Sequence, residues 1–293
     1  MQLTLPAHPP FSFHSVVKSH GWVQLVPFGF DEAGAALRYV DRLSSGRIVE
    51  YRIVESTTGV SLQIDGKITR CEQKEIADKV TWMLGLEQDF SEFYALGRSE
   101  PKLAQAEAKA QGRVLRSATL FEDAVKTILT TNTLWGATRR MSANLVAQFG
   151  EALEGDSARR AFPTPERLAA STAEILKSET RLGYRAPYIH ELAVRVASGA
   201  LELEAYKTSD LATLELRKQL MKIKGVGAYA AANLLMLLGR YDFLPVDSWA
   251  MKMVAHEWHE GKPVGAAEVE AAFAEWGRWK GLAYWFWDWS YTS

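Results

Sequence analysis

The sequence of 293 residues has only one cysteine, Cys71. A lone cysteine excludes a disulfide framework within the chain and any metal centre built from its cysteines alone, and it is typical of a reducing compartment. No apolar run is long enough to span a bilayer. The segment 1–17 has no basic region and is interrupted by prolines, so we expect no signal peptide. We therefore expect an intracellular protein, in the cytoplasm or nucleoid, or in the nucleus if its source is eukaryotic.

The chain also lacks an excess of charge of either sign, with a formal net charge of −1 at pH 7. Proteins that coat nucleic acid are usually strongly basic, so this balance argues against that class but leaves room for a local basic face. Hydrophobic residues make up 47% of the chain and charged residues 24%. This composition is typical of a globular protein with a substantial core.

The first third of the chain predicts a small antiparallel sheet. The segment VSLQI (60–64) alternates apolar and polar side chains, as a half-buried strand does. The turn-like segments SSG (44–46) and TTG (57–59) separate it from RIVEYRIVES and from a strand before that. In EQKEIADKVTWMLGL the apolar residues instead follow the spacing of one helix face, and Gly85 is suited to end that helix.

From about residue 100 onward the apolar spacing is helical, with Gly, Pro or polar breaks between segments. We therefore predict an α+β protein with two domains. Residues 1–97 would form an N-terminal antiparallel β-sheet domain with a packed helix. Residues 98–293 would form a mostly α-helical, two-lobed domain.

The segment IKGVGAYAA places two glycines, Gly225 and Gly227, between two amphipathic helices. Glycine in a helical pattern costs about 1 kcal/mol relative to alanine, so two of them indicate an unusual turn or the close approach of a ligand. A dinucleotide site would need a preceding strand and a third glycine, where this chain has Ala230. A glycine turn that opens a helix exposes N–H groups suited to phosphate. Four cations on and before the turn favour a polyanionic ligand: Arg217, Lys218, Lys222 and Lys224.

Asp247 follows in the segment LPVDSW. The simplest interpretation of a lone aspartate here is an N-cap of the predicted helix SWAMKMVAHEW. The simplest interpretation of the glycines is that they let two helices turn and pack closely. The glycine turn followed at this spacing by the aspartate is much less frequent by chance than either feature alone, so the combination indicates a function.

The hairpin followed by Pro-Val-Asp resembles the helix-hairpin-helix (HhH-GPD) DNA glycosylases, whose hallmark is a hairpin, a Gly/Pro-rich loop and an aspartate. The resemblance extends over most of the chain. GRVLRSATLFEDAVKTILTTNT looks like the helix and loop that carry the DNA-intercalating wedge, and RLGYRAPYIHELA resembles the segment that contacts the strand near the lesion. The N-terminal sheet is similar to the extra β domain of 3-methyladenine DNA glycosylase II and 8-oxoguanine DNA glycosylase. EWGRWKGLAYWFWDW is similar to the aromatic last helix of the alkyladenine branch.

The resemblance implies roles for residues in the hairpin motif (about 213–238) and in the loop after it (about 239–248). Asp247 matches the catalytic aspartate, which stabilises an oxocarbenium-like sugar or orients the attacking water. The carbonyls of Lys222, Ile223 and Gly225 are candidates for holding a monovalent cation, with no metal in catalysis. The residues expected to contact the DNA backbone are Gly225, Gly227, Lys222, Lys224 and Ala228.

The resemblance also implies a wedge and a base pocket. Asn132 falls at the wedge position, next to Thr133, and fills the gap left by a flipped nucleotide. Tyr184 and Arg185 match residues that contact the strand near the lesion. An aromatic stripe is more often plain core than pocket, but the candidate pocket residues are Tyr229, Asn233, Trp285, Trp287 and Trp289. In the tract KLAQAEAKAQGRVLR we expect a solvated helix or linker from which Arg113 and Arg116 could reach DNA.

Tyr229 stands where the bifunctional members carry a lysine that attacks the sugar and forms a Schiff base. A phenol cannot form an imine, so we predict a monofunctional hydrolase that releases an alkylated purine from double-stranded DNA and leaves an abasic site. We expect no cofactor, no membrane association and no obligate protein partner, and therefore a monomer. Two alternatives stay open: an 8-oxoguanine-type glycosylase without lyase activity, favoured by Asn132 and Tyr184-Arg185, and a non-catalytic helix-hairpin-helix DNA-binding protein in which Asp247 is only a cap.

Overall fold

The computed structural model describes residues 1–289, and the chain divides into two compact units. Unit 1 contains residues 1–88 and 113–208, and unit 2 contains residues 89–112 and the segment from Ser209 onward. Each unit therefore contains chain from both sides of the boundary predicted between residues 97 and 98. The N-terminal sheet shares its unit with helices that the sequence assigned to the second domain.

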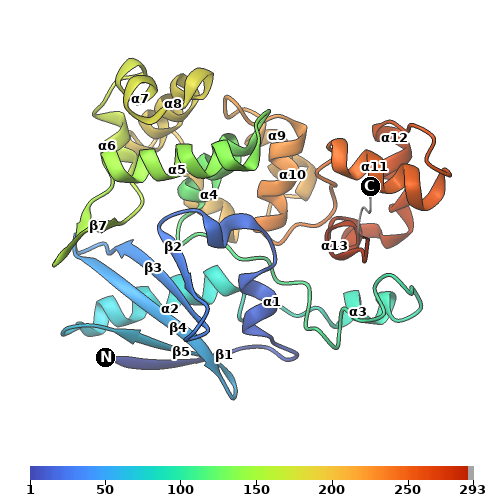
Figure 1. The fold of residues 1–293 in the computed structure, drawn as a ribbon, viewed down its shortest axis with the longest axis horizontal. Helices are drawn as coiled ribbons and strands as arrows, with labels where there is room; N and C mark the ends of the chain where they lie inside the picture. The colour runs from blue at the N-terminus through green and yellow to red at the C-terminus, as the bar shows by residue number, and fades with distance from the viewer. Residues whose placement is uncertain (290–293) are drawn as a thin grey trace. The chain divides into compact units, whose positions relative to one another are not determined.

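Unit 1 begins with a five-stranded antiparallel sheet in the order β1-β5-β4-β3-β2 (Figure 1). Val60, Leu62 and Ile64 are all buried, so the alternation in the sequence does mark a face that packs against the core. The sheet and the helices below confirm the predicted α+β class. The strands are β1 (Gln2–Pro6), β2 (Phe28–Asp31), β3 (Ala36–Arg42), β4 (Ile48–Ser56) and β5 (Gly59–Ile64).

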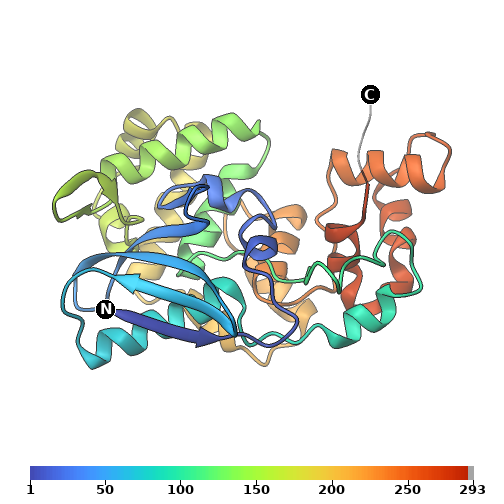
Figure 2. The ribbon, with the colours of Figure 1, turned by 60° about the horizontal axis from the view of Figure 1, so that its bottom comes forward.

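Helix α2 (Arg70–Leu84) lies along the sheet (Figures 1 and 2). Thr69 and Glu72 form a capping box at its start, which satisfies two backbone N–H groups that have no partner inside the helix. At its end Gly85 adopts the left-handed conformation with φ of 59°, as predicted for this stop. The buried apolar residues of α2 are Ile76, Val80, Met83 and Leu84. They form the one helix face that the sequence predicted.

The remaining elements of unit 1 are mostly helices. Almost all side chains of one of them, α4, are buried. A two-stranded hairpin, β6–β7, follows α5. The α-helices are α1 (Phe13–Val17), α4 (Leu120–Thr130), α5 (Trp135–Phe149), α6 (Pro165–Ala169), α7 (Ala173–Thr180) and α8 (Ala186–Ala197). The 3₁₀ helices and the hairpin strands are η1 (Gly21–Gln24), η2 (Gly183–Arg185), η3 (Leu203–Thr208), β6 (Ala152–Leu153) and β7 (Asp156–Arg160).

The expectation for Arg113 and Arg116 is wrong. Both arginines are buried, with 1% and 4% of their surface exposed. The Arg113 guanidinium donates to the carbonyl oxygens of His8, Pro10, Gly85 and Gln88 at 2.6–2.9 Å, so it binds loops of unit 1 together. Residues 101–110, just before, form turns and not a helix.

Among the described residues, the regular elements of unit 2 are all helices, joined by turns and loops. Its core contains an aromatic cluster in which Tyr241 stacks on Trp279 with ring centroids 5.6 Å apart, and Phe90 packs against both. Within residues 1–289, no helix combines the length and the apolar character needed to cross a membrane. The helices of unit 2 are α3 (Ser91–Gly97), α9 (Thr213–Leu220), α10 (Ala228–Leu237), α11 (Ser248–Trp258), α12 (Ala266–Ala272), η4 (Ala274–Trp279) and α13 (Lys280–Phe286).

Candidate active site

Helices α9 and α10 form the hairpin of unit 2, and its two glycines serve different needs. Gly225 has φ of +85°, a left-handed conformation that favours a residue without a Cβ. Gly227 has an ordinary φ of −88°, and a Cβ placed there would meet no atom within 4 Å. Neither the backbone nor the packing inside the protein requires glycine at 227, so its smallness suits the close approach of an external group.

The first turn of α10 is open to such a group. Its N-cap, Gly227, provides no side-chain hydrogen bond, and Gly227 and Ala228 are both exposed. The first N–H groups of a helix have no partner within the helix, and together with the helix dipole they attract anions. Val226, between the glycines, is buried and closes the turn by donating its N–H to the Ile223 carbonyl at 3.0 Å.

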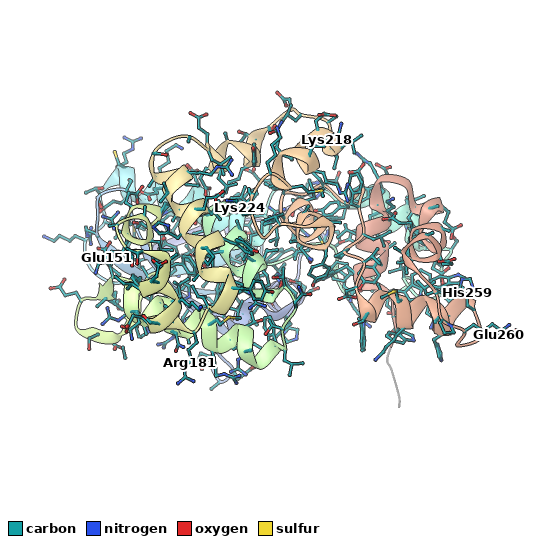
Figure 3. The ribbon with its side chains drawn as sticks, turned by 90° about the horizontal axis from the view of Figure 1, so that it is seen from above. Glu151, Arg181, Lys218, Lys224, His259 and Glu260 are labelled. Carbon is teal, nitrogen blue, oxygen red and sulfur yellow. The ribbon has the colours of Figure 1, made fainter. Side chains whose placement is uncertain are left out.

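The cations of the hairpin differ in their surroundings. Lys222 and Lys224 are exposed beside the turn, and Lys218 is exposed on α9, where it pairs with Glu215 at 2.7 Å (Figure 3). Arg217 instead turns inward, with its guanidinium 4.8 Å from the centre of the Phe243 ring. The turn therefore presents lysines as point charges on flexible stems, which suit phosphate without specifying its orientation.

The carbonyls proposed for a monovalent cation lie in the same turn. The Ile223 carbonyl oxygen accepts the Val226 N–H with one lone pair. Its second lone pair is available to coordinate a cation. Those of Lys222 and Gly225 belong to the same short turn. The donor set, neutral oxygens only, fits a hard cation of low charge.

Asp247 is the N-cap of α11, as its simplest interpretation requires. Its Oδ1 accepts the N–H groups of Trp249 and Ala250, both at 2.9 Å. Among the described residues no hydrogen bond to Oδ2 is seen, and the side chain is only half-buried. The cap therefore uses one oxygen and holds the other in a fixed position.

Two phenols lie within the electrostatic reach of Asp247. Burial, with the Asp247 carboxylate as the second cause, raises the pKa of Tyr229. Burial and the same carboxylate raise the pKa of Tyr284 well above its ordinary value. Asn233, one turn beyond Tyr229, donates its amide to the Tyr229 carbonyl at 3.0 Å, so it supports α10 locally. The structure thus brings Tyr229 and Asp247 together, and both tyrosines stay neutral at physiological pH.

The three tryptophans of the C-terminal stripe have different environments. Trp287 packs against Trp258 and Phe273, with ring centroids 5.0 and 5.3 Å away, and its indole donates to Glu257 at 3.2 Å. Trp285 is half-buried on α13. Trp289 meets Trp249 edge-to-face, with centroids 4.7 Å apart.

Sequence reasoning missed two residues near Asp247. Trp249 follows it by two positions, is 48% exposed and forms an aromatic pair with Trp289. Its place in LPVDSW was the available signal, because residues directly after a capping aspartate occupy the first turn beside it. Tyr284 lies far away in the sequence and left no such signal.

The predicted wedge and strand-contact residues lie together in unit 1. Asn132 is exposed in the loop between α4 and α5, and its φ of +46° is left-handed. The Tyr184 hydroxyl donates to the Thr131 carbonyl at 3.3 Å, and the Arg185 guanidinium donates to the same carbonyl. Thr133, the next loop residue after Asn132, is half-buried. Leu134 was not predicted, yet it is 83% exposed, the highest exposure among the large apolar residues within 1–289.

Three features together are typical of a helix-hairpin-helix protein. They are the N-terminal sheet, the glycine hairpin that leads into a helix without a side-chain cap, and the carboxylate fixed at the start of the next helix. The chain belongs to the HhH-GPD superfamily of base excision DNA repair proteins, whose family model matches residues 125–278. This confirms the family resemblance found in the sequence. The matched span includes the α4–α5 loop, the hairpin and Asp247.

One curated relative and two solved structures extend this finding. A DNA-3-methyladenine glycosylase of Bacillus subtilis (strain 168) is 26% identical over 183 residues. The match covers 61% of this chain, and the chain spans 60% of the length of that relative. It is therefore similar to this protein over part of its length.

The 3-methyladenine DNA glycosylase from Archaeoglobus fulgidus has a TM-score of 0.76 at 21% identity, covering 98% of this chain and 96% of that chain. The Clostridium acetobutylicum 8-oxoguanine glycosylase/lyase, in complex with DNA containing cytosine opposite 8-oxoG, has a TM-score of 0.73 at 21% identity. That match covers 94% of this chain and 90% of the other. At these identities the two structures show that the fold is shared.

Proposed function

We propose that this protein is a monofunctional DNA glycosylase of base excision repair that removes an alkylated purine from double-stranded DNA. The observation that carries the proposal is that Asp247, with one oxygen fixed by the α11 cap, lies within the electrostatic reach of Tyr229. The family resemblance matches Tyr229 to the lysine of the bifunctional members. The family match and the partial match to a DNA-3-methyladenine glycosylase support it.

In the proposed reaction the protein binds the phosphate backbone through the open start of α10 and the exposed Lys222 and Lys224. The target nucleotide leaves the base stack, because the bond to be cut is inaccessible inside a duplex. As the bond between base and sugar breaks, the base leaves with the bonding electrons and positive charge develops on the sugar. The Asp247 carboxylate stabilises that charge, and water adds to the sugar carbon and loses a proton, which leaves an abasic site.

The aromatic surroundings of Asp247 suit an electron-poor, often cationic, alkylated base. Such a base is already a good leaving group and needs little acid catalysis. Neutral aromatic rings stack on it, with a cation–π gain of about 0.5–2 kcal/mol where water is excluded. Tyr229, Trp249 and Trp289 are the side chains we propose for this stacking. Tyr229 lies within the electrostatic reach of Asp247, and Trp249, two residues after Asp247, forms an aromatic pair with Trp289. Trp287 packs among other aromatic rings, so we propose a supporting role for it.

An oxidised-purine glycosylase that lacks lyase activity is the second candidate. The observation that favours it is the cluster of Asn132, Tyr184 and Arg185 around the α4–α5 loop, together with a fold shared with an 8-oxoguanine glycosylase/lyase. Release assays on duplexes carrying 3-methyladenine, hypoxanthine or 8-oxoguanine separate the two candidates, because each predicts a different preferred lesion.

The test of catalysis is Asp247→Asn. Asparagine caps a helix as well as aspartate does, but it carries no charge to stabilise the sugar, so base release should fall by about 10²–10³-fold. Binding to the abasic product duplex should stay within a few-fold of wild type. Release at the wild-type rate would leave Asp247 as a cap only. A wild-type protein that binds the duplex but releases no base from any lesion would instead favour a non-catalytic DNA-binding protein. We further propose that the enzyme works on cellular DNA as a monomer without a cofactor.

A further inference from the structure

We infer that Arg185 is a positioning residue, which holds the loop 131–134 at the end of α4 and does not make the strand contact that the family resemblance implies for it. Tyr184 acts with it. The inference rests on the proposed function only in assuming that the loop contacts DNA. The contacts that hold the loop are present in the protein without DNA.

Arg185 is placed beneath the loop. Only 6% of its surface is exposed, and its guanidinium donates to the Thr131 carbonyl and lies 3.3 Å from the Asn132 carbonyl. The Tyr184 hydroxyl donates to the same Thr131 carbonyl at 3.3 Å, and the guanidinium lies 4.4 Å from the centre of the Tyr184 ring. The Arg185 Nε is buried and has no hydrogen-bond partner among the described residues, so the two carbonyls and the aromatic face are the contacts that hold the side chain beneath the loop.

The end of α4 explains why a cation is placed there. The last carbonyls of a helix have no partner within the helix and carry the negative end of its dipole. Side chains cap the preceding carbonyls of α4: Thr130 donates to Thr127 at 2.7 Å, Thr131 to Ile128 at 2.8 Å, and Thr138 to Leu129 at 3.1 Å. Arg185 and Tyr184 extend this series to the carbonyl of Thr131, the C-cap of α4.

The loop needs such support because its own conformation is unfavourable. Asn132 is left-handed with φ of +46°, a conformation that asparagine tolerates better than most residues but that persists where the surroundings fix it. Leu134 exposes 83% of its surface and so contributes little packing. On the far side of the loop, the Trp135 indole donates to Gln24 at 2.9 Å. The loop is therefore fixed at both ends while its tip is free.

Hydrogen exchange of the free protein tests the inference without DNA. Arg185→Met keeps the length of the side chain and removes its donors, so the amides of 131–134 should exchange about tenfold faster or more, since charged hydrogen bonds are the strong ones. Arg185→Lys should restore part of the protection, and Tyr184→Phe should cause a smaller increase in the exchange rate.

Arg181→Met is the matched control. Arg181 is an exposed arginine four residues before Arg185 (Figure 3), and its substitution should leave the exchange of 131–134 unchanged. Unchanged exchange in Arg185→Met would overturn the inference.

Salt dependence of binding distinguishes positioning from phosphate contact. The probe is a duplex with an abasic site, the product of the proposed reaction. Losing a phosphate contact lowers the slope of log K against log salt by about 0.9. Arg185→Met should weaken binding with the slope unchanged, and a reduced slope would show direct contact and overturn the inference. If Arg185→Met does not fold, Tyr184→Phe and Arg185→Lys decide by the same two measurements. Failure of the wild-type protein to bind this duplex would count against the proposed function and leave the exchange result standing.

Discussion

At the scale of single residues, Asp247 has a structural role besides its proposed catalytic one, so its substitutions affect stability as well as activity. Its Oδ1 caps α11, so Asp247→Ala should destabilise the protein by about 1 kcal/mol, whereas Asp247→Asn should change stability by only a few tenths. Urea unfolding of both variants checks this. A large loss of stability in Asp247→Asn would mean that its loss of base release cannot be assigned to charge alone.

Tyr229 is the residue on which the proposal of hydrolysis without strand cleavage depends. Burial and Asp247 raise its pKa, so it is a neutral phenol at physiological pH and cannot form an imine with the sugar. Borohydride treatment of the wild-type protein with lesion duplex should therefore trap no covalent adduct, while a bifunctional glycosylase in parallel gives one. An adduct in the wild-type lane would show that another lysine reaches the sugar and that the protein is bifunctional.

At the scale of elements, the α4–α5 loop makes a prediction for Leu134. A leucine with 83% of its surface exposed is unfavourable in water and suits insertion between bases, where apolar side chains unstack a step. Leu134→Ala should leave the free energy of unfolding within about 0.5 kcal/mol of wild type but weaken binding to abasic-site duplex. Leu96→Ala, on α3, is the control, since Leu96 is 43% exposed and lies far along the chain from the loop. Equal affinity of the two variants would remove Leu134 from the DNA contact.

Elements with a strong local signal were predictable from the sequence. The strand at β5, the helix α2 with its stop at Gly85, and the two helices around the hairpin follow from periodicity and glycine placement, which act within a few residues. The N-cap position of Asp247 was predicted from its place before a helical pattern and is confirmed, whereas its catalytic role comes from the family resemblance and stays a prediction. These features depend little on what the rest of the chain does.

Features that depend on distant partners were not predictable. Arg113 looked like a surface cation, but its donors are satisfied by four carbonyls from separate loops, and no local pattern encodes that. The guanidinium of Arg185 likewise meets an element more than 50 residues away in sequence. A buried arginine and an exposed one look alike in a sequence, because only tertiary packing determines which groups surround the charge.

At the scale of the whole molecule, unit 1 is held together by a buried polar network that joins the sheet to α4. Tyr39 of β3 donates to Glu122 at 2.6 Å, and the fully buried Lys126 donates to Glu122 at 2.5 Å. Trp22 donates to Asp123 at 2.8 Å. These bonds cross the predicted boundary between the sheet and the helical domain, which explains why the sheet shares a unit with α4.

Removing one partner of this network should be costly. Lys126→Met would leave the Glu122 carboxylate buried without its cation, and such a change costs about 3–5 kcal/mol. The double variant Lys126→Met/Glu122→Gln should cost less than the sum of the single variants, because the glutamine is neutral and can still accept from Tyr39. A double-mutant cycle by urea unfolding measures this coupling, and strict additivity would show that the pair contributes nothing as a pair.

His20 makes the stability of unit 1 depend on pH. Its Nε2 lies 2.6 Å from the Leu115 carbonyl, and burial, aided by the Lys126 charge, lowers its pKa to about 4. An unfolded histidine has a pKa of about 6.5, so the unfolded chain takes up a proton first as the pH falls, and stability is lost between about pH 6.5 and pH 4. The loss due to His20 should reach about 2 kcal/mol between pH 7 and pH 5. His20→Gln can hold the same carbonyl without titrating, and the buried carboxylates are common to both proteins. The difference in unfolding free energy between wild type and His20→Gln should therefore change by this amount across the interval, and a constant difference would show that His20 titrates normally in the folded protein.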